Sequence, residues 1–238
     1  KILYSKLSIK SSIITKKDLK KYDFIVVGWV EDLYFLLLTG FPKNKIIHIC
    51  QSYETWSNNP TICNLAYQSK VNRLFVSEWL NNSLSDYSLK TFVIGNYIRN
   101  DFIYSGIQKN SIRDNIVYQS HSGWWKNSTE NLIFSSKLSE IMNLKLTQLG
   151  YGIKHGNHTY KKNIDYKKII SLLDKTIYFI SLSHYEGMPL AAIEALSRGC
   201  KCILSEIPAH IELQRNFKDH VHLVKLPVFA KQVNSIPK

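Results

Sequence analysis

The residues best suited to chemistry are two glutamates in the stretch HYEGMPLAAIEALSRG. Glu186 and Glu194 are separated by seven residues, and Glu194 falls inside a segment whose other side chains are almost all apolar. Burying a carboxylate costs several kcal/mol unless the charge is paired. An ion pair with Arg198, four residues further on, is one explanation for Glu194. The other is a ligand whose vicinal hydroxyls, such as those of a ribose, donate hydrogen bonds to the carboxylate.

The elements predicted around these glutamates are typical of a ligand site in a parallel α/β sheet. The sequence predicts a strand, a turn, a helix over 188–198 and a second strand. Pro189 suits the first helical turn, and Gly199 suits the C′ position that ends the helix. Glu186 then lies in the loop between the carboxyl end of a strand and a helix N-terminus. Parallel α/β sheets bind ligands at this place, and the backbone N–H groups there attract phosphate.

The composition limits the class of protein and its partners. The chain has 238 residues, 45% of them apolar, and a formal charge of +13 from 31 Lys and Arg against 18 Asp and Glu. This length fits one large domain or two small ones with a real core. The charge favours phosphorylated small molecules, nucleic acid or an acidic membrane surface. The densest basic cluster, TKKDLKK at 15–21, is expected to be a solvated helix face.

The cysteines and the apolar runs indicate the cellular location of the protein. The four cysteines show no paired CxxC spacing, and Cys200 and Cys202 are expected on one buried face of a strand. No apolar run approaches the roughly 20 residues that span a bilayer, and the first residues lack the apolar core of a signal peptide. We therefore expect an intracellular, cytoplasmic protein without a metal site. Because residue 1 is Lys, we also expect an initiator Met or a longer stretch upstream.

The fold class is predicted to be α/β, with parallel sheets covered by helices on both faces. Short apolar runs rich in Val, Ile, Phe and Tyr alternate with segments of helical period. Helices are expected at 77–87 and 128–142, the second with Ser128 as its N-cap. The expected strands are 23–29, 45–50, 73–77, 90–96, 115–120, 144–150, 176–183 and 200–206.

Two domains are predicted because the periodicity lapses among polar residues at 97–115. The first, over 1–100, is expected to be a Rossmann-like domain on the acceptor side, and the second, over 112–225, a Rossmann-like domain that binds the donor. Residues 226–238 are expected to be a tail. We expect the two domains to face each other across a ligand cleft.

The stretch SHYEGMPLAAIEALSRGC resembles the donor-binding signature of retaining glycosyltransferases of family 4, which have the B-type fold (GT-B) of two Rossmann-like domains. The resemblance implies that Glu186 contacts the donor sugar. It further implies that the amides of Gly187 and Met188 contact the sugar and the phosphates, that Pro189 belongs to the same donor-binding loop, and that Glu194 binds the nucleotide ribose.

Other segments extend this resemblance over most of 73–212. They are VSEWLNNSL, VIGNYIRNDF, IVYQSHSGWWKNSTENLI, LTQLGYG and ILSEIPAHIE. Relatives place a basic pair on the pyrophosphate near the opening of the second domain. Here Lys126 matches one member, and the other position holds Ser120 or His121, so the resemblance implies a catalytic role for Lys126 beside Glu186 and a donor contact for His121. The family's glycine-rich N-terminal loop is not visible in KILYSKLSIKSSI, so the first domain is expected to be pared down or incomplete.

The acceptor side is expected to include Gln51 and Glu54, in HICQSYETW. Many relatives place a histidine near the reacting centre where this chain has Gln51. Gln51 equally fits a hydrogen bonder at the end of a strand. The implied activity is sugar transfer from a nucleotide-sugar, such as a UDP- or GDP-sugar, to a hydroxyl of a glycan, lipid or protein. It is metal-independent and needs no cofactor.

Two other functions remain open from the sequence. A non-catalytic protein could bind nucleic acid or another polyanion through its basic charge and through Trp124 and Trp125, which precede Lys126. The two tryptophans fit loop or core anchors better, and nucleic acid is not the expected partner. Some sugar epimerases share the two-domain architecture, although the glutamate pair favours transfer.

Overall fold

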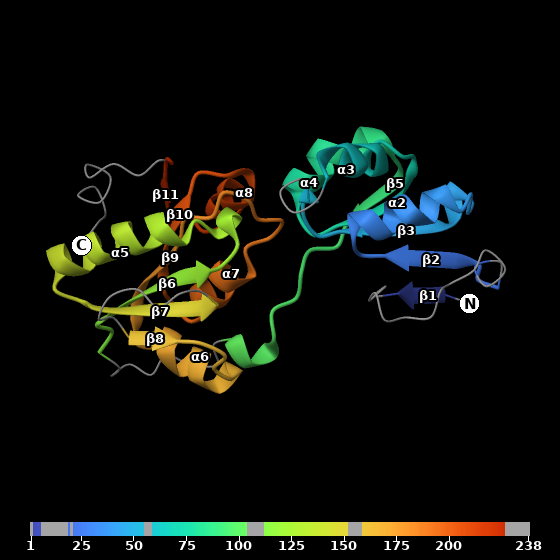
Figure 1. Ribbon diagram of the computed structural model, residues 1–238. Coiled ribbons are helices and arrows are strands. Elements are labelled where there is room, and N and C mark those ends of the chain that lie inside the picture. The colour runs from blue at the N-terminus through green and yellow to red at the C-terminus, as the bar shows by residue number, and fades with distance from the viewer. Residues whose placement is uncertain are drawn as a thin grey trace. The chain divides into compact units, whose positions relative to one another are not determined.

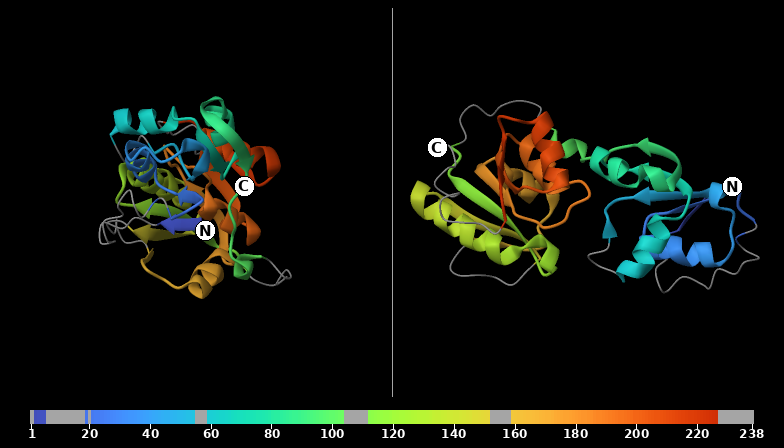
Figure 2. Two further views of the ribbon diagram at one scale, coloured as in Figure 1. Left: turned by 90° about the vertical axis from the view of Figure 1, so that its right-hand side faces the viewer. Right: turned by 90° about the horizontal axis from the view of Figure 1, so that it is seen from above.

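The computed structural model divides the chain into two compact units, which are residues 1–96 and 97–238. Both are α/β, as predicted, and each contains one fully parallel sheet (Figures 1 and 2). The residues that the structure describes are 2–5, 19, 21–54, 59–103, 112–151 and 159–226. The predicted basic helix face at 15–21 and the tail therefore fall almost entirely outside the described residues.

The first unit has a five-stranded sheet in which the strands follow one another in sequence order. Its strands are β1 (Ile2–Ser5), β2 (Phe24–Val27), β3 (Ile46–Cys50), β4 (Val71–Phe75) and β5 (Ser88–Val93). Its helices are α2 (Val30–Leu38), α3 (Pro60–Tyr67) and α4 (Glu78–Leu84), with short 3₁₀ turns η1 (Lys43–Lys45) and η3 (Ser85–Tyr87). The helix α3 begins where sequence rules place a start, because Asn59 accepts hydrogen bonds from the backbone of Thr61 and Ile62, and Pro60 follows it.

A buried arginine links β4 to the end of α3 in the first unit. The Arg73 side chain on β4 is fully buried, and burial lowers the pKa of its guanidinium. It donates to the carbonyl oxygens of Ala66, Tyr67 and Ser69 at the end of α3, at 2.8–3.1 Å. It also donates to the Tyr87 carbonyl oxygen at 2.7 Å. A cation at a helix C-terminus compensates the negative end of the helix dipole, so Arg73 holds α3 against the sheet.

The second unit has a six-stranded sheet with the strand order of a doubly wound nucleotide-binding fold. The order is β11-β10-β9-β6-β7-β8, which in chain order within the unit is 6-5-4-1-2-3. Its strands are β6 (Asn115–His121), β7 (Lys145–Tyr151), β8 (Thr159–Lys161), β9 (Thr176–Ser181), β10 (Lys201–Ser205) and β11 (Val221–Val224). Its helices are α5 (Ser128–Met142), α6 (Tyr166–Leu173), α7 (Leu190–Ser197) and α8 (Pro208–Asn216), with 3₁₀ turns η4 (Asn100–Phe102) and η5 (Trp124–Lys126). The order reverses between β6 and β9, and this reversal is the switch point of the sheet.

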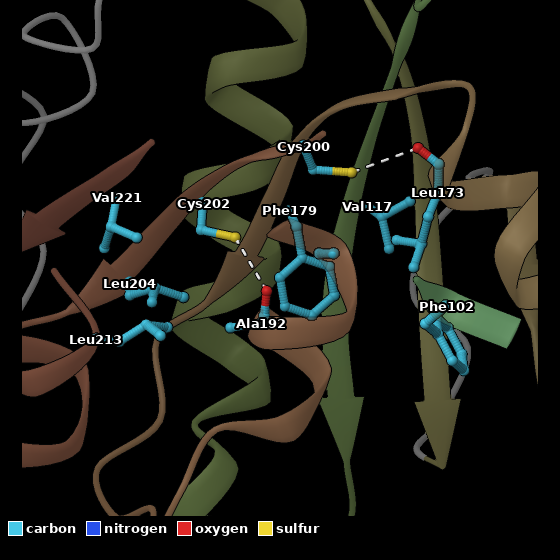
Figure 3. Close-up of a cluster of buried hydrophobic side chains, with 11 residues drawn as sticks. Phe102, Val117, Leu173, Phe179, Ala192, Cys200, Cys202, Leu204, Leu213 and Val221 are labelled. Atoms are coloured by element: carbon cyan, nitrogen blue, oxygen red, sulfur yellow. Dashed lines mark hydrogen bonds between the residues drawn. The ribbon is translucent and has the colours of Figure 1, made fainter. Parts of the chain in front are cut away.

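Two apolar clusters cover the faces of this sheet, as the prediction of a doubly covered sheet requires. On β6, Ile116 and Tyr118 pack in one cluster with α5, whereas Val117 packs in the other with α6 and α7. Cys200 and Cys202 are fully buried free thiols of the second cluster, which confirms the expectation for them. Their thiols donate to the carbonyl oxygens of Leu173 and Ala192 (Figure 3).

All eight predicted strands are present, with bounds shifted by up to a few residues, and the described part of the chain contains three further strands that were missed. The missed strands are β1, β8 and β11. The helix α5 spans the predicted residues, but Ser128 is its first residue and not its N-cap. The N-cap is Asn127, whose φ of 51° lies in the left-handed region that asparagine tolerates. Among the described residues, no helix is both long and apolar enough to cross a membrane.

Candidate functional site

The loops that follow β6 and β9 meet at the switch point of the second unit. These two strands are paired in parallel, with Tyr118 opposite Ile180, so their carboxyl ends lie at the same edge of the sheet. The backbone N–H of His184 in one loop donates to the carbonyl oxygen of Trp125 in the other, at 2.7 Å. Open α/β sheets bind ligands at this edge and at this reversal. The predicted donor residues of both loops therefore fall at one place.

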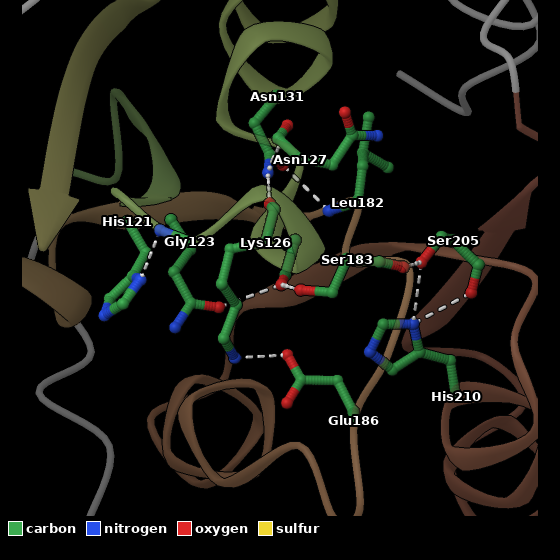
Figure 4. A network of polar contacts seen from close by, with 12 residues as sticks. His121, Gly123, Lys126, Asn127, Asn131, Leu182, Ser183, Glu186, Ser205 and His210 are labelled. Atoms are coloured by element: carbon green, nitrogen blue, oxygen red, sulfur yellow. Dashed lines mark hydrogen bonds and ion pairs between the residues drawn. The ribbon is translucent and has the colours of Figure 1, made fainter. Parts of the chain in front are cut away.

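Lys126 and Glu186 form an ion pair across the two loops. The distance from Lys126 Nζ to Glu186 Oε1 is 2.6 Å (Figure 4). The exposed fractions of the two side chains are 18% and 12%, so the pair is largely withdrawn from water. Sequence reasoning assigned Lys126 to phosphate and Glu186 to sugar, and the structure brings the two together. Each group supplies the opposite charge that offsets the cost of burying the other.

Asn131 on α5 fixes both loops, and sequence reasoning missed it. Its side chain is fully buried. Its amide donates to the carbonyl oxygen of Lys126 at 2.9 Å, and its Oδ1 accepts from the backbone N–H of Leu182 at 2.8 Å (Figure 4). Asn131 thus sets the spacing between the Lys126 and Glu186 loops. No local sequence pattern singles out this asparagine, because both of its loop contacts depend on the tertiary fold.

His121 ends β6 and is held in one tautomer. Its Nδ1 accepts from the backbone N–H of Gly123 at 2.9 Å, so the neutral ring carries its proton on Nε2. Burial, and then the Lys126 charge, lower the pKa of His121. Ser128 donates to the carbonyl oxygen of His121 and accepts from its N–H. The predicted capping role of Ser128 is therefore wrong, because its hydroxyl is used to anchor the strand end.

Ser120 lies inside the sheet and does not reach the loops. Its side chain is 1% exposed, and its hydroxyl accepts from Gln148 Nε2 at 3.0 Å. Of the two positions that the resemblance offered for the second phosphate-binding group, only His121 belongs to the loop region.

His210 on α8 is a second missed residue beside the ion pair. Its Nδ1 lies 2.8 Å from the carbonyl oxygen of Ser205, which can only accept, so the proton of the neutral ring is on Nδ1. Burial lowers the pKa of His210 to about 4, against a smaller opposing effect of Glu186. Its Nε2 is buried without a hydrogen-bond partner among the described residues. Ser205 in turn donates to the Ser183 carbonyl oxygen in the Glu186 loop, so α8 and this loop are joined (Figure 4).

Glu194 carries its carboxylate on α7, half-buried. Burial raises its pKa above the ordinary value for a glutamate. The explanation by an ion pair with Arg198 is wrong, because Arg198 forms a bidentate pair with Asp174 at 2.7 and 2.9 Å. Among the described residues, the Glu194 carboxylate has no hydrogen-bond or ion-pair partner. A half-buried acceptor of this kind is suited to a ligand that brings donors.

The helix α7 is shorter than predicted at both ends, at Leu190–Ser197 instead of 188–198. Pro189 is its N-cap and not a residue of the first turn, whereas Gly199 occupies the predicted C′ position with a φ of +76°. The N–H of Gly199 donates to Leu196 and that of Cys200 to Ala195, which is the Schellman pattern. Gly187 is buried and Met188 half-buried in the loop that leads to Pro189.

The two candidates in the first unit differ in their surroundings. Gln51 is exposed directly after β3, where a Cβ on Gly28 would lie 3.3 Å from its Nε2. Glu54 is 3% exposed, and its Oε2 accepts from the N–H of Val30 at 2.8 Å, at the start of α2. Burial raises the pKa of Glu54 to about 7. The contact with Val30 makes Glu54 a helix cap, and its expected acceptor role stays a prediction.

Among the described residues, no group of three or more His, Cys, Asp or Glu side chains is arranged to hold a metal ion. The ionisable side chains argued above to form the site are those of Lys126, Glu186, Glu194, His121 and His210.

Comparison with protein families gives one match, to the family described as glycosyl transferases group 1, over residues 142–233. This range contains Glu186 and Glu194 but begins after the Lys126 loop. The comparison with curated proteins found no match. Among solved structures, the chain is similar to TarM, with a TM-score of 0.68 at 13% identity over 92% of this chain and 49% of that one. The chain has the fold of the GT-B glycosyltransferases. The predicted α/β class and Rossmann-like units are thereby confirmed, while assignment to family 4 stays a prediction.

Other solved structures with this fold cover the chain almost as fully. A sucrose-phosphate synthase from Thermosynechococcus elongatus matches 92% of this chain and 66% of its own length, with a TM-score of 0.68 at 12% identity. The pneumococcal O-GlcNAc transferase GtfA, solved in complex with UDP and GlcNAc, matches 92% of this chain and 49% of its own, with a TM-score of 0.65 at 12% identity. The chain therefore spans about half the length of TarM and of GtfA.

Proposed function

We propose that the protein is a retaining glycosyltransferase that moves a sugar from a nucleotide-sugar to an acceptor hydroxyl. The observation that carries the proposal is the Lys126–Glu186 ion pair at the switch point of a doubly wound sheet. It joins one group suited to phosphate and one suited to sugar hydroxyls at the place where such sheets bind nucleotides. The match to group 1 glycosyltransferases over the Glu186 and Glu194 segment supports it.

The donor is bound by an exchange of partners. Lys126 leaves Glu186 for the diphosphate, because two phosphate charges attract the ammonium more strongly than one carboxylate does. Glu186 is then released to accept hydrogen bonds from the hydroxyls of the sugar. The Nε2–H of His121 and the backbone N–H groups of Gly187 and Met188 contribute further donors to the phosphates, and Glu194 accepts from the ribose hydroxyls.

The chemical step breaks the bond between the anomeric carbon and the diphosphate oxygen. Lys126 and the loop amides stabilise the negative charge that develops on the leaving group. The acceptor oxygen forms its bond on the face that the diphosphate leaves, and its proton passes to a phosphate oxygen of the leaving group. Charge neutralisation rests on protein groups in this scheme, so we propose that no metal or other cofactor takes part.

We also propose a class of donor, a class of acceptor and a location for the reaction. The GtfA structure holds UDP, which supports a UDP-sugar as donor, and a GDP-sugar fits the same contacts. A similar structure of a trehalose-6-phosphate synthase concerns glycosyl transfer with retention, which supports a retaining reaction. The charge of +13 exceeds what one diphosphate needs, which supports work in the cytoplasm at an anionic membrane surface, with a glycan, lipid or protein as acceptor.

A thermal-shift series tests the function. UDP, GDP, ADP and dTDP, each free and as a sugar conjugate, are added to the full chain. At about 100 times its dissociation constant, a ligand that binds only the native state stabilises it by about 2.7 kcal/mol. We expect one nucleotide and its sugar conjugate to raise the midpoint, and transfer to a glycan or lipid acceptor to follow with that donor. Tight, salt-sensitive binding of DNA or RNA without any nucleotide effect would favour the polyanion-binding alternative instead.

A further inference from the structure

A cavity in the first unit is lined by none of the donor loops, all of which belong to the second unit. Its volume is about 350 Å³, within the range of small-molecule sites. Its lining comes from α3, α4 and the segments next to them, and it joins aromatic rings to uncharged polar groups. The lining residues are Tyr53, Asn64, Tyr67, Gln68, Trp79, Ser83, Leu84 and Tyr87.

The aromatic wall of this cavity is held in place before any ligand arrives. The Tyr53 ring stacks on the Tyr67 ring, with centroids 4.8 Å apart and planes 19° from parallel. Tyr67 is 1% exposed, and its hydroxyl donates to the Ser52 carbonyl oxygen and accepts from the N–H of Glu54. The Tyr53 hydroxyl donates to Asn64 Oδ1 at 3.0 Å. A rigid aromatic surface loses little conformational entropy when a ligand packs on it.

Polar groups remain available around the rings. Because Asn64 uses its Oδ1 for Tyr53, its amide N–H groups remain as donors. Gln68 is exposed and offers both a donor and an acceptor, since no hydrogen bond engages its side chain within the described part of the chain. The Tyr87 side chain is 43% exposed.

The lining is also without charge. None of the described residues that line the cavity is acidic or basic, although the chain as a whole carries +13. Among these lining residues an anionic ligand would find no cation, and a purely apolar ligand would leave the amides without partners. A sugar ring presents C–H faces to aromatic rings and hydroxyls to amides, so it matches both parts of the lining.

From this combination of residues we infer that the α3–α4 cavity is a binding site for a neutral saccharide, separate from the donor site. The site does not depend on the proposed transfer reaction, because it uses none of the donor residues. It would hold a sugar unit of a carbohydrate chain on the first unit, whatever the second unit binds.

Calorimetry or saturation-transfer NMR on the full chain tests this site with glucose, galactose, N-acetylglucosamine and their β-linked dimers. We expect at least one of these sugars to bind with a dissociation constant of about 1 mM, and in any case below about 10 mM. Gln68→Ala and Tyr87→Ala should each weaken that binding about fivefold or more. The matched controls are Asn82→Ala, on the exposed surface of α4, and Phe92→Ala, an exposed aromatic on β5.

The two proposals fail separately in this experiment. Saccharide binding should persist in Glu194→Ala and in the presence of UDP, because none of the donor-binding residues lines the cavity. No binding of any saccharide at about 50 mM, or binding that the Gln68 and Tyr87 variants leave unchanged, would overturn the inference. Preference for inorganic phosphate over every neutral sugar would overturn it as well.

Discussion

Replacing Lys126 by alanine separates its structural role from its chemical role. The variant leaves the Glu186 carboxylate, only 12% exposed, without the cation 2.6 Å away. Breaking a fully buried pair costs about 3 to 5 kcal/mol, and this pair keeps some contact with water, so we expect a loss of about 2 to 3 kcal/mol in the free energy of unfolding. We further expect kcat to fall by about two to three orders of magnitude, as for removal of one electrostatic stabiliser.

A double variant distinguishes these two losses. Lys126→Met combined with Glu186→Gln removes both charges, so no unpaired charge is left, and stability should return to within about 1 kcal/mol of the wild type. Turnover should stay low, because neither the phosphate nor the sugar contact is restored. Lys126→Arg keeps the charge with a different shape and should recover part of the activity.

Urea unfolding followed by fluorescence gives the stability of each variant, and product formation with the donor found by thermal shift gives kcat. A Lys126→Ala protein as stable as the wild type would show that the ion pair is not formed in solution. Wild-type turnover in the same protein would show that Lys126 does not stabilise the leaving group, and the diphosphate would then depend on His121 and the loop amides.

Three further predictions concern stability. Gly150→Ala should lower the free energy of unfolding in urea by about 2 to 3 kcal/mol, because the new Cβ would collide with the Ser120 carbonyl oxygen at a φ of +123°. Gly40→Ala, at a φ of +76° with open space around it, has backbone strain alone and should cost less. Equal losses in the two variants would refute the collision. Arg73→Met should destabilise the first unit by about 3 kcal/mol or more, since the carbonyl oxygens at the end of α3 lose their donors. Arg73→Lys should recover little of this loss. An Arg73→Met protein as stable as the wild type would contradict this. Burial lowers the pKa of His210 to about 4, so between about pH 6.5 and 4 the unfolded chain binds a proton that the folded chain does not. The free energy of unfolding should therefore fall by roughly 3 kcal/mol as the pH drops through that window. A His210→Asn protein with the same pH slope would exclude His210 as the cause.

The sequence predicted the central strands well because burial on both faces makes them continuously apolar. Ile180 on β9 and Val117 on β6 belong to such runs. The missed strands lie at sheet edges, where this signal is absent. The residues of β8, Thr159–Lys161, are exposed or half-exposed, and β1 was hidden in a lysine-containing stretch that lacks an apolar run.

The candidate site was predictable only where it is local in the chain. Glu186 and Glu194 stand on one loop and the helix that follows, so their spacing alone suggested a site. Asn131 acts through a long-range contact with Leu182, 51 residues away. His210 is bonded to Ser205 nearby in the chain, but its place beside Glu186 depends on the tertiary fold. No local pattern points to either residue. The partner of Arg198 was mispredicted for the same reason, because Asp174 lies on another element.

The most direct test of the central claim is calorimetry of the nucleoside diphosphate against Glu194→Ala, Glu186→Gln and a matched control. Losing the Glu194 acceptor should weaken diphosphate binding by about 1.5 to 3 kcal/mol, or roughly 10- to 150-fold. Glu186→Gln should leave diphosphate affinity within about threefold and lower turnover instead, because its carboxylate is proposed to contact the sugar. Glu140→Ala, an exposed glutamate on α5, should change neither. Equal losses of diphosphate affinity in the Glu186 and Glu194 variants, or unchanged affinity in Glu194→Ala, would contradict the account of how the donor is bound.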